Sequence, residues 1–70
     1  MPWRGHARLL AELVLREPGR ERVRIGVVDE TVRRGDVVRV DGRADWVVAG
    51  TPDTTNPALD VRVVCTRRSG

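Results

Sequence analysis

The side chains that could do chemistry in this chain are few and far apart. It has one cysteine, Cys65, and one histidine, His6, and their separation in the sequence does not match the ligand spacing of a metal site. Cys65 ends the apolar run Val61–Cys65, which is typical of a small buried strand residue rather than a reactive thiol. The acidic residues are dispersed among arginines, and there is no Gly-rich phosphate loop. We therefore expect no catalytic residues, no metal, no cofactor and no enzymatic activity.

Arginine is the dominant charged side chain. All 13 basic residues are arginine, against 10 acidic residues, for a net charge of +3. A row of arginines can contact phosphates without reading a base sequence, and four residues are placed to do so: Arg22, Arg24, Arg33 and Arg34. The interleaved acids weaken that positive field, and the stacking aromatics of a single-strand platform are nearly absent. Three interpretations stay open: a solubilising mixed-charge surface, packing against other protein subunits, or non-specific nucleic-acid contact.

The valine-rich second half predicts a hairpin. Val38 and Val40 alternate with polar or outward-facing neighbours, which is the two-residue period of a half-buried strand. Asp41-Gly42 predicts a tight turn, because both residues tolerate positive φ. A second strand follows as far as Gly50, and a last one is expected over Leu59–Thr66.

The first segment fits two structures. Ala7–Leu15 contains good helix formers, whereas Leu13–Ile25 has the pattern of a hairpin turning at Pro18-Gly19. Pairing around that turn matches residues of opposite charge or apolar type: Glu17 with Arg20, Arg16 with Glu21, and Val14 with Val23. On the strand that follows, Val23, Ile25 and Val27 point one way, and Arg22 and Arg24 the other. We favour the hairpin and leave open a short helical turn before it.

A polar segment with two prolines, residues 51–57, predicts a surface loop. Loops of this kind often contact partners, and tryptophan is enriched at interface hot spots. The candidate protein-contact residues are Trp46, Thr51, Asp53, Thr54, Thr55 and Asn56. For Trp46 the alternative is a plug in the core or at the end of a barrel.

Five short strands with turns between them predict one all-β domain over residues 1–70, with residues 1–8 and 67–70 as flexible ends. The expected architecture is a small antiparallel five-stranded SH3-like barrel, with an OB-like barrel as second choice, and Trp3 either capping it or exposed. Because so short a chain buries only about 60% of its unfolded surface, a partner or homo-oligomer would add burial. No apolar run approaches 18 residues, so we expect no membrane contact and a cytoplasmic or virion location.

The second half also carries an ordered set of motifs. A Gly-Asp turn precedes a strand, a Gly-Arg turn leads to a strand ending in an apolar-Gly pair, and a polar loop precedes an apolar strand with a cysteine: Gly35-Asp36-Val37-Val38, Asp41-Gly42-Arg43, Trp46–Gly50, Pro52-Asp53 and Leu59–Cys65. This order, over residues 32–66, resembles bacteriophage head–tail joining proteins of the head-closure, or stopper, connector type. Such connectors usually have a long loop or helix between the early strands, where this chain passes directly from Val28 to Val32.

The resemblance implies a non-enzymatic virion subunit that forms a ring of copies between a portal or adaptor and tail components. The first hairpin and the loop at residues 51–57 would then contact neighbouring subunits, and arginines could line a channel for DNA. Two alternatives remain from the residues themselves. One is a small nucleic-acid-binding SH3-like barrel associated with transcription or the ribosome, and the other is an accessory or inhibitor protein that binds one partner protein.

Overall fold

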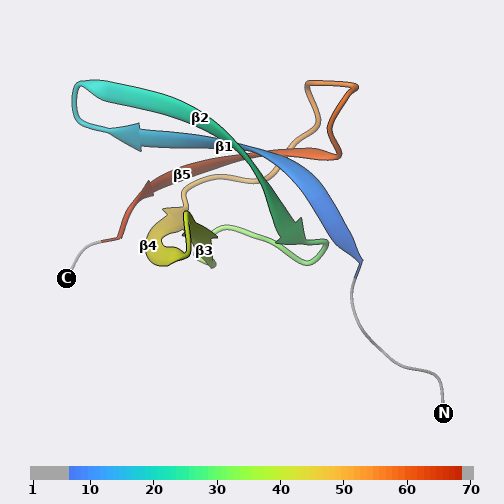
Figure 1. Ribbon diagram of the computed structural model, residues 1–70, viewed down its shortest axis with the longest axis horizontal. Coiled ribbons are helices and arrows are strands. Elements are labelled where there is room, and N and C mark those ends of the chain that lie inside the picture. The colour runs from blue at the N-terminus through green and yellow to red at the C-terminus, as the bar shows by residue number, and fades with distance from the viewer. Residues whose placement is uncertain (1–6, 69–70) are drawn as a thin grey trace, which may run out of the picture.

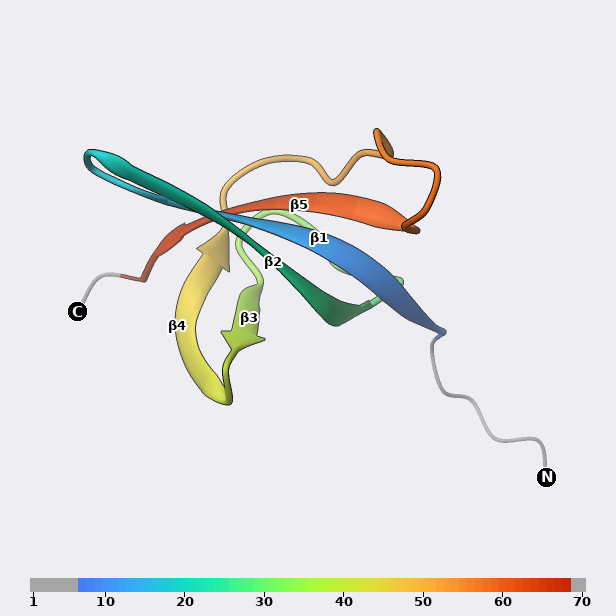
Figure 2. The same ribbon diagram turned by 45° about the horizontal axis from the view of Figure 1, so that its top comes forward.

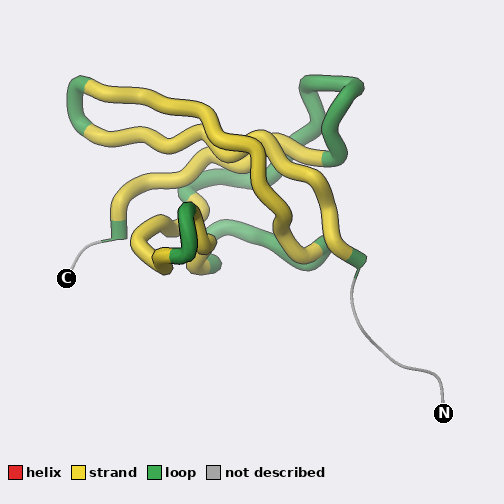
Figure 3. Tube along the Cα trace, in the orientation of Figure 1, coloured by secondary structure: helices red, strands yellow, loops and turns green. Residues whose placement is uncertain are grey.

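The computed structural model describes residues 7–68, which contain strands and loops but no helix (Figures 1 and 3). The strands are β1 (Arg8–Glu17), β2 (Arg20–Asp29), β3 (Val37–Val40), β4 (Arg43–Val48) and β5 (Val61–Arg67). No helix in residues 7–68 has the length and hydropathy that crossing a bilayer requires. Arg8 begins β1 and Arg67 ends β5, and the predictions for Trp3 and His6 lie outside the described residues.

The five strands form one mixed sheet in the order β2-β1-β5-β4-β3, and this sheet curls into a half-barrel (Figure 2). The all-β prediction is confirmed, but the prediction of a purely antiparallel barrel is wrong. β1 and β5 run parallel, from Ala11 opposite Val61 to Arg16 opposite Thr66. A short turn forces two strands to run antiparallel, whereas these two are joined by most of the chain and are free to run either way.

The β1–β2 hairpin has the predicted turn and register. Glu17 pairs with Arg20, Arg16 with Glu21 and Val14 with Val23. Gly19 has φ 72°, and Arg16 Nε donates to Glu21 Oε1 at 2.7 Å. The helical alternative for Ala7–Leu15 is wrong. β1 lies between β2 and β5 in the sheet, so its backbone forms hydrogen bonds with a strand on each side. Three consecutive buried residues, Leu13, Val14 and Leu15, are typical of a strand covered on both faces.

The β3–β4 hairpin turns at Asp41 and Gly42, whose φ angles of 53° and 78° are those of the predicted tight turn. Before β3, Gly35 has φ 93°, and Asp36 Oδ2 accepts a hydrogen bond from Arg33 N at 3.0 Å. Asp36 O in turn accepts from Val48 N at 2.9 Å, which ties this turn to the end of β4.

The core lies on the inner, concave side of the curled sheet, between the β1–β5 pair and the β3–β4 hairpin. Its largest fully buried side chains come from three strands: Leu13, Leu15, Val48, Val63 and Cys65. β2 closes over one side of this core at Gly26. A Cβ at Gly26 would lie 2.7 Å from Leu13 Cδ1, so only glycine allows β2 to pass this close.

The substitution Gly26→Ala tests this close approach. We expect it to lower the free energy of unfolding by about 1–3 kcal/mol, the usual effect of adding a methyl group to a packed core. The measurement is the midpoint of urea unfolding, compared at an unchanged dependence of the free energy of unfolding on urea concentration. Gly50→Ala is the matched control, because a Cβ there would meet nothing within 4 Å. Equal midpoints for the two variants would contradict the packing of β2 on Leu13.

Candidate protein-interaction surface

The apolar side of β2 faces away from the core. Its side chains alternate as predicted, with valines and isoleucine on one side and arginines on the other. The register places Arg22 opposite Leu15 and Arg24 opposite Leu13, both core residues, so the arginines share the inner side. Val23, Ile25 and Val27 therefore lie on the outer side, where they are 52%, 59% and 53% exposed.

These residues join a neighbour on β1 to form what we call the outer apolar strip: Leu10, Val23, Ile25 and Val27. Leu10 lies opposite Val27 in the register and is 43% exposed. Next to the strip, Val14 lies between Val23 and Val64 of the flanking strands and is only 3% exposed. The outer face is thus already packed at its centre, and its apolar surface continues to the edge of the sheet.

Charged residues surround the strip. Glu12 lies between Ile25 and Arg62 in the register, and Arg16 pairs with Glu21 near the hairpin turn. Arg62 Nη1 lies 3.9 Å from Asp53 Oδ1. An apolar centre bordered by exposed charges is the usual anatomy of a protein–protein contact.

The four arginines considered for phosphate contact lie in two separate places. Arg22 and Arg24 are on the inner side of β2 toward the hairpin turn, whereas Arg33 and Arg34 are exposed in the turn beyond the other end of β2. Arg24 Nη2 lies 3.8 Å from Asp41 Oδ2 across the open side of the half-barrel. Arg22 Nε is buried and has no hydrogen-bond partner in the described part of the chain. The structure therefore does not combine the four arginines into one patch.

Trp46 lies in the core rather than on the surface. It is 4% exposed, and the Arg67 guanidinium carbon lies 4.9 Å from the centroid of its ring. Arg67 also forms an ion pair with Glu17 at 2.9 Å, which holds the guanidinium over the tryptophan. Of the two interpretations of Trp46, the structure gives the interior one.

The loop at residues 51–57 is exposed at its predicted contact residues, Thr51, Asp53, Thr54, Thr55 and Asn56. Asp53 pairs with Arg62 through two backbone hydrogen bonds of 3.1 and 2.6 Å. After the loop, Asp60 N donates to Leu10 O at 2.9 Å, and Asp60 Oδ2 accepts from Leu10 N at 2.7 Å. The end of the loop is thus fixed beside one end of the outer apolar strip.

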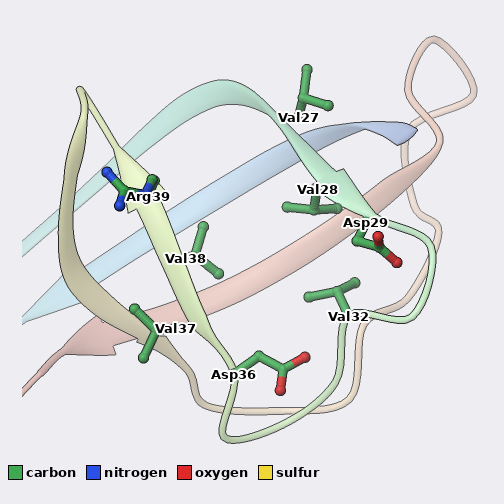
Figure 4. Close-up of a pocket in the computed structure, with 8 residues that line it drawn as sticks. All are labelled: Val27, Val28, Asp29, Val32, Asp36, Val37, Val38 and Arg39. Carbon is green, nitrogen blue, oxygen red and sulfur yellow. The ribbon is translucent and has the colours of Figure 1, made fainter. Parts of the chain in front are cut away.

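A groove of about 330 Å³ lies between the end of β2 and β3 (Figure 4). Val28 and Val38 face this space, whereas Val27 points to the opposite side of β2. The two carboxylates of the groove, those of Asp29 and Asp36, accept hydrogen bonds within the neighbouring turns. Asp29 Oδ1 accepts from Thr31 N and Oγ1 at 2.8 and 2.7 Å, and Asp36 accepts from Arg33 N. The groove is a gap between two strand edges, with no pair of carboxylates poised for acid–base chemistry.

Residues 7–68 contain no cluster of three or more His, Cys, Asp or Glu side chains placed to hold a metal ion. Cys65 is completely buried as predicted, and this burial raises the pKa of its thiol to about 11. Comparison with protein-family models, with curated proteins and with solved structures found no match to this chain.

The outer apolar strip was missed by the sequence analysis, although one signal for it was present. Leu9-Leu10 and Leu13-Val14-Leu15 place apolar residues on both faces of β1, so both faces of the sheet carry apolar surface. The rest of the sheet can curl toward either face of β1, and the side to which it curls decides which face of β2 lies toward the core.

The buried thiol gives the protein a defined alkaline pH dependence. The free energy of unfolding should fall by about 2 kcal/mol between pH 9 and pH 11, because the pKa of the thiol is at its ordinary value of 9.0 in the unfolded chain and about 11 in the folded chain. Well below pH 9 the thiol is protonated in both states and contributes no slope. The chain has no lysine and no tyrosine, so Cys65 is the single side chain titrating in this window.

Urea unfolding at pH 8, 9, 10 and 11 measures this slope, with Cys65→Ala as the control. The variant should show a flat profile above pH 9, even if it is less stable throughout. Parallel profiles for the two proteins would show that the thiol is not the cause.

Proposed function

We propose that this chain is a non-enzymatic interaction module that binds protein subunits through the outer apolar strip of the β1–β2 hairpin. The observation that carries this proposal is the exposure of Val23, Ile25 and Val27 along one face of an edge strand. Single exposed apolar residues are ordinary, but a continuous row on an edge strand attracts other chains. Soluble proteins usually interrupt such a row with a charge, a proline or a bulge, and the outer face of β2 has none of these over residues 23–27.

The resemblance of residues 32–66 to head–tail connectors supports a finer proposal. In it the module is a virion subunit that assembles into a ring of copies, and the fold is a reduced barrel of the SH3-like kind. Genes for portal and tail proteins beside its own gene, and ring-shaped particles in electron micrographs, are the expected observations. A strictly monomeric protein encoded far from any virion gene would remove this version.

Nucleic-acid contact is the second candidate, because Arg33 and Arg34 are exposed next to each other in the turn before β3. Such binding would depend steeply on salt, since it rests on counterion release. A shift in the electrophoretic mobility of duplex or single-stranded DNA at low salt would support it, provided that the shift is weaker with Arg22→Glu/Arg24→Glu. Absence of any shift at low salt would dismiss it.

Replacing Val23, Ile25 and Val27 together by threonine tests the main proposal. Threonine keeps the β-branched shape of the strand but removes apolar surface, so association should weaken at least tenfold, which is about 1.4 kcal/mol. The measurement is the particle mass by sedimentation, in lysate of the producing cells and with purified protein over a concentration series. We expect the natural chain to exceed its monomer mass of 7.8 kDa and the variant to approach it.

The control is Arg33→Ser/Arg34→Ser, which changes exposed residues beyond the end of β2 and should leave the mass unchanged. A natural chain that sediments as a monomer both in lysate and at high concentration would refute the interaction proposal.

A further inference from the structure

The free edge of β2 is formed by the same residues that carry the outer apolar strip. Glu30 N donates to Ala7 O at 2.9 Å, which extends the β1–β2 ladder by one pair beyond Arg8 and Asp29. Because hydrogen bonding alternates along an antiparallel ladder, the even-numbered residues of β2 bond to β1. The backbone N–H and C=O groups of Val23, Ile25 and Val27 therefore point away from β1. This edge presents apolar side chains and backbone donors and acceptors together.

We propose that β2 pairs with β2 of a second copy of this chain, antiparallel and centred on Ile25, so that two sheets join into one. This inference rests on the proposed function and names its partner. Ile25 then lies opposite Ile25 of the second copy, and Val23 lies opposite Val27. The outer apolar strips of the two copies become one continuous surface across the new ladder.

The sequence of β2 favours this register over those centred on Val23 and Arg24. Centring on Val23 would place Arg22 opposite Arg24 of the second copy and Glu21 opposite Ile25. Centring on Arg24 would place that arginine against its own copy and Glu21 opposite Val27. Like charges directly opposite destabilise a sheet, and so does a charge facing an apolar neighbour. Centring on Ile25 instead places Arg24 opposite Gly26, which has no side chain, and keeps each β2 residue of the outer apolar strip opposite another. Its one charge facing an apolar residue, Arg22 opposite Val28, lies on the inner side of β2.

One like-charge pair remains in this register, Glu21 opposite Asp29 at each end. Both carboxylates already have local partners. Glu21 Oε1 accepts from Arg16 Nε at 2.7 Å, and Asp29 Oδ1 accepts two hydrogen bonds from Thr31. These positions are exposed, where water and salt screen the remaining repulsion.

The molecule also has space beside the edge. The groove between the end of β2 and β3 runs along Val27, Val28 and Asp29, where the first residues of the incoming strand would lie. A symmetric contact of this type is self-complementary and closes at two copies. An extended segment of a different protein could pair with the same edge. It would need apolar residues at every second position to match Val23, Ile25 and Val27, and β2 itself already has them.

A cysteine at the symmetry axis distinguishes these partners. In Ile25→Cys the two new thiols would face each other across a hydrogen-bonded pair, with Cα atoms about 5.5 Å apart, within disulfide range. The natural Cys65 does not compete, because it is buried and protonated. In Val23→Cys the two thiols would lie four residues, or about 13 Å, out of register, which is too far.

We expect Ile25→Cys to form a disulfide-linked dimer under mild oxidation at least tenfold faster than Val23→Cys, as followed on non-reducing gels. A mixture of Val23→Cys with Val27→Cys should give the mixed dimer in preference to either self-linked one. Equal rates for Ile25→Cys and Val23→Cys would indicate random collision and would overturn the proposal, as would a monomeric Ile25→Cys protein.

Ile25→Pro provides a second readout that needs no new thiol. It removes an outward N–H that the β1 ladder does not use, so circular dichroism should still show a sheet while the dimer mass is lost. A dimer that survives this change would overturn the pairing. If the natural chain assembles but Ile25→Cys does not link, the second-copy partner is wrong and the interaction module stands. If the natural chain is monomeric everywhere, both proposals fall.

Discussion

The parallel pairing of β1 with β5 is the contact on which the rest of this fold depends. Without it the sheet would separate into the β1–β2 hairpin and the three strands β3, β4 and β5, and an isolated hairpin is marginally stable in water. The pairing places Leu13 beside Val63 and Leu15 beside Cys65 on one face, which gives the two hairpins a common core. β5 is consequently the middle strand, and two of its inner residues, Val63 and Cys65, are completely buried.

The same pairing determines which face of β2 meets solvent. Because Leu13 and Leu15 point toward β3 and β4, the β1–β2 register leaves Arg22 and Arg24 on the inner side. The inner side near the hairpin turn lies at the open margin of the half-barrel, where Arg24 can reach Asp41. The apolar alternation of β2 therefore does not serve the core of a single chain. A strand pattern that is apolar on the solvent side is consistent with burial by another molecule.

Local chemistry accounts for the parts of the fold that were predictable. Gly19 and the Asp41-Gly42 pair specify their turns through positive φ, and the charge pairs beside Pro18-Gly19 specify the register. Cys65 was predictable as a core residue from its apolar run. The parallel ladder was not, because it joins residues 50 apart in the sequence, such as Ala11 and Val61, and no turn signal reports on such a contact. The outer apolar strip depends on that ladder, so it was hidden for the same reason.

The open half-barrel explains why the edge of β2 is left unpaired. β3 has four residues and β2 has ten, so pairing β3 with β2 could cover only part of the β2 edge. Val28 and Val38 already share the core across this gap, and Arg24 and Asp41 bridge its other end. Side chains thus close the interior without satisfying the backbone of Val23, Ile25 and Val27. The core of the single chain is therefore complete while the backbone groups along this edge stay unpaired, so the pairing that we propose would add to the sheet rather than complete the core.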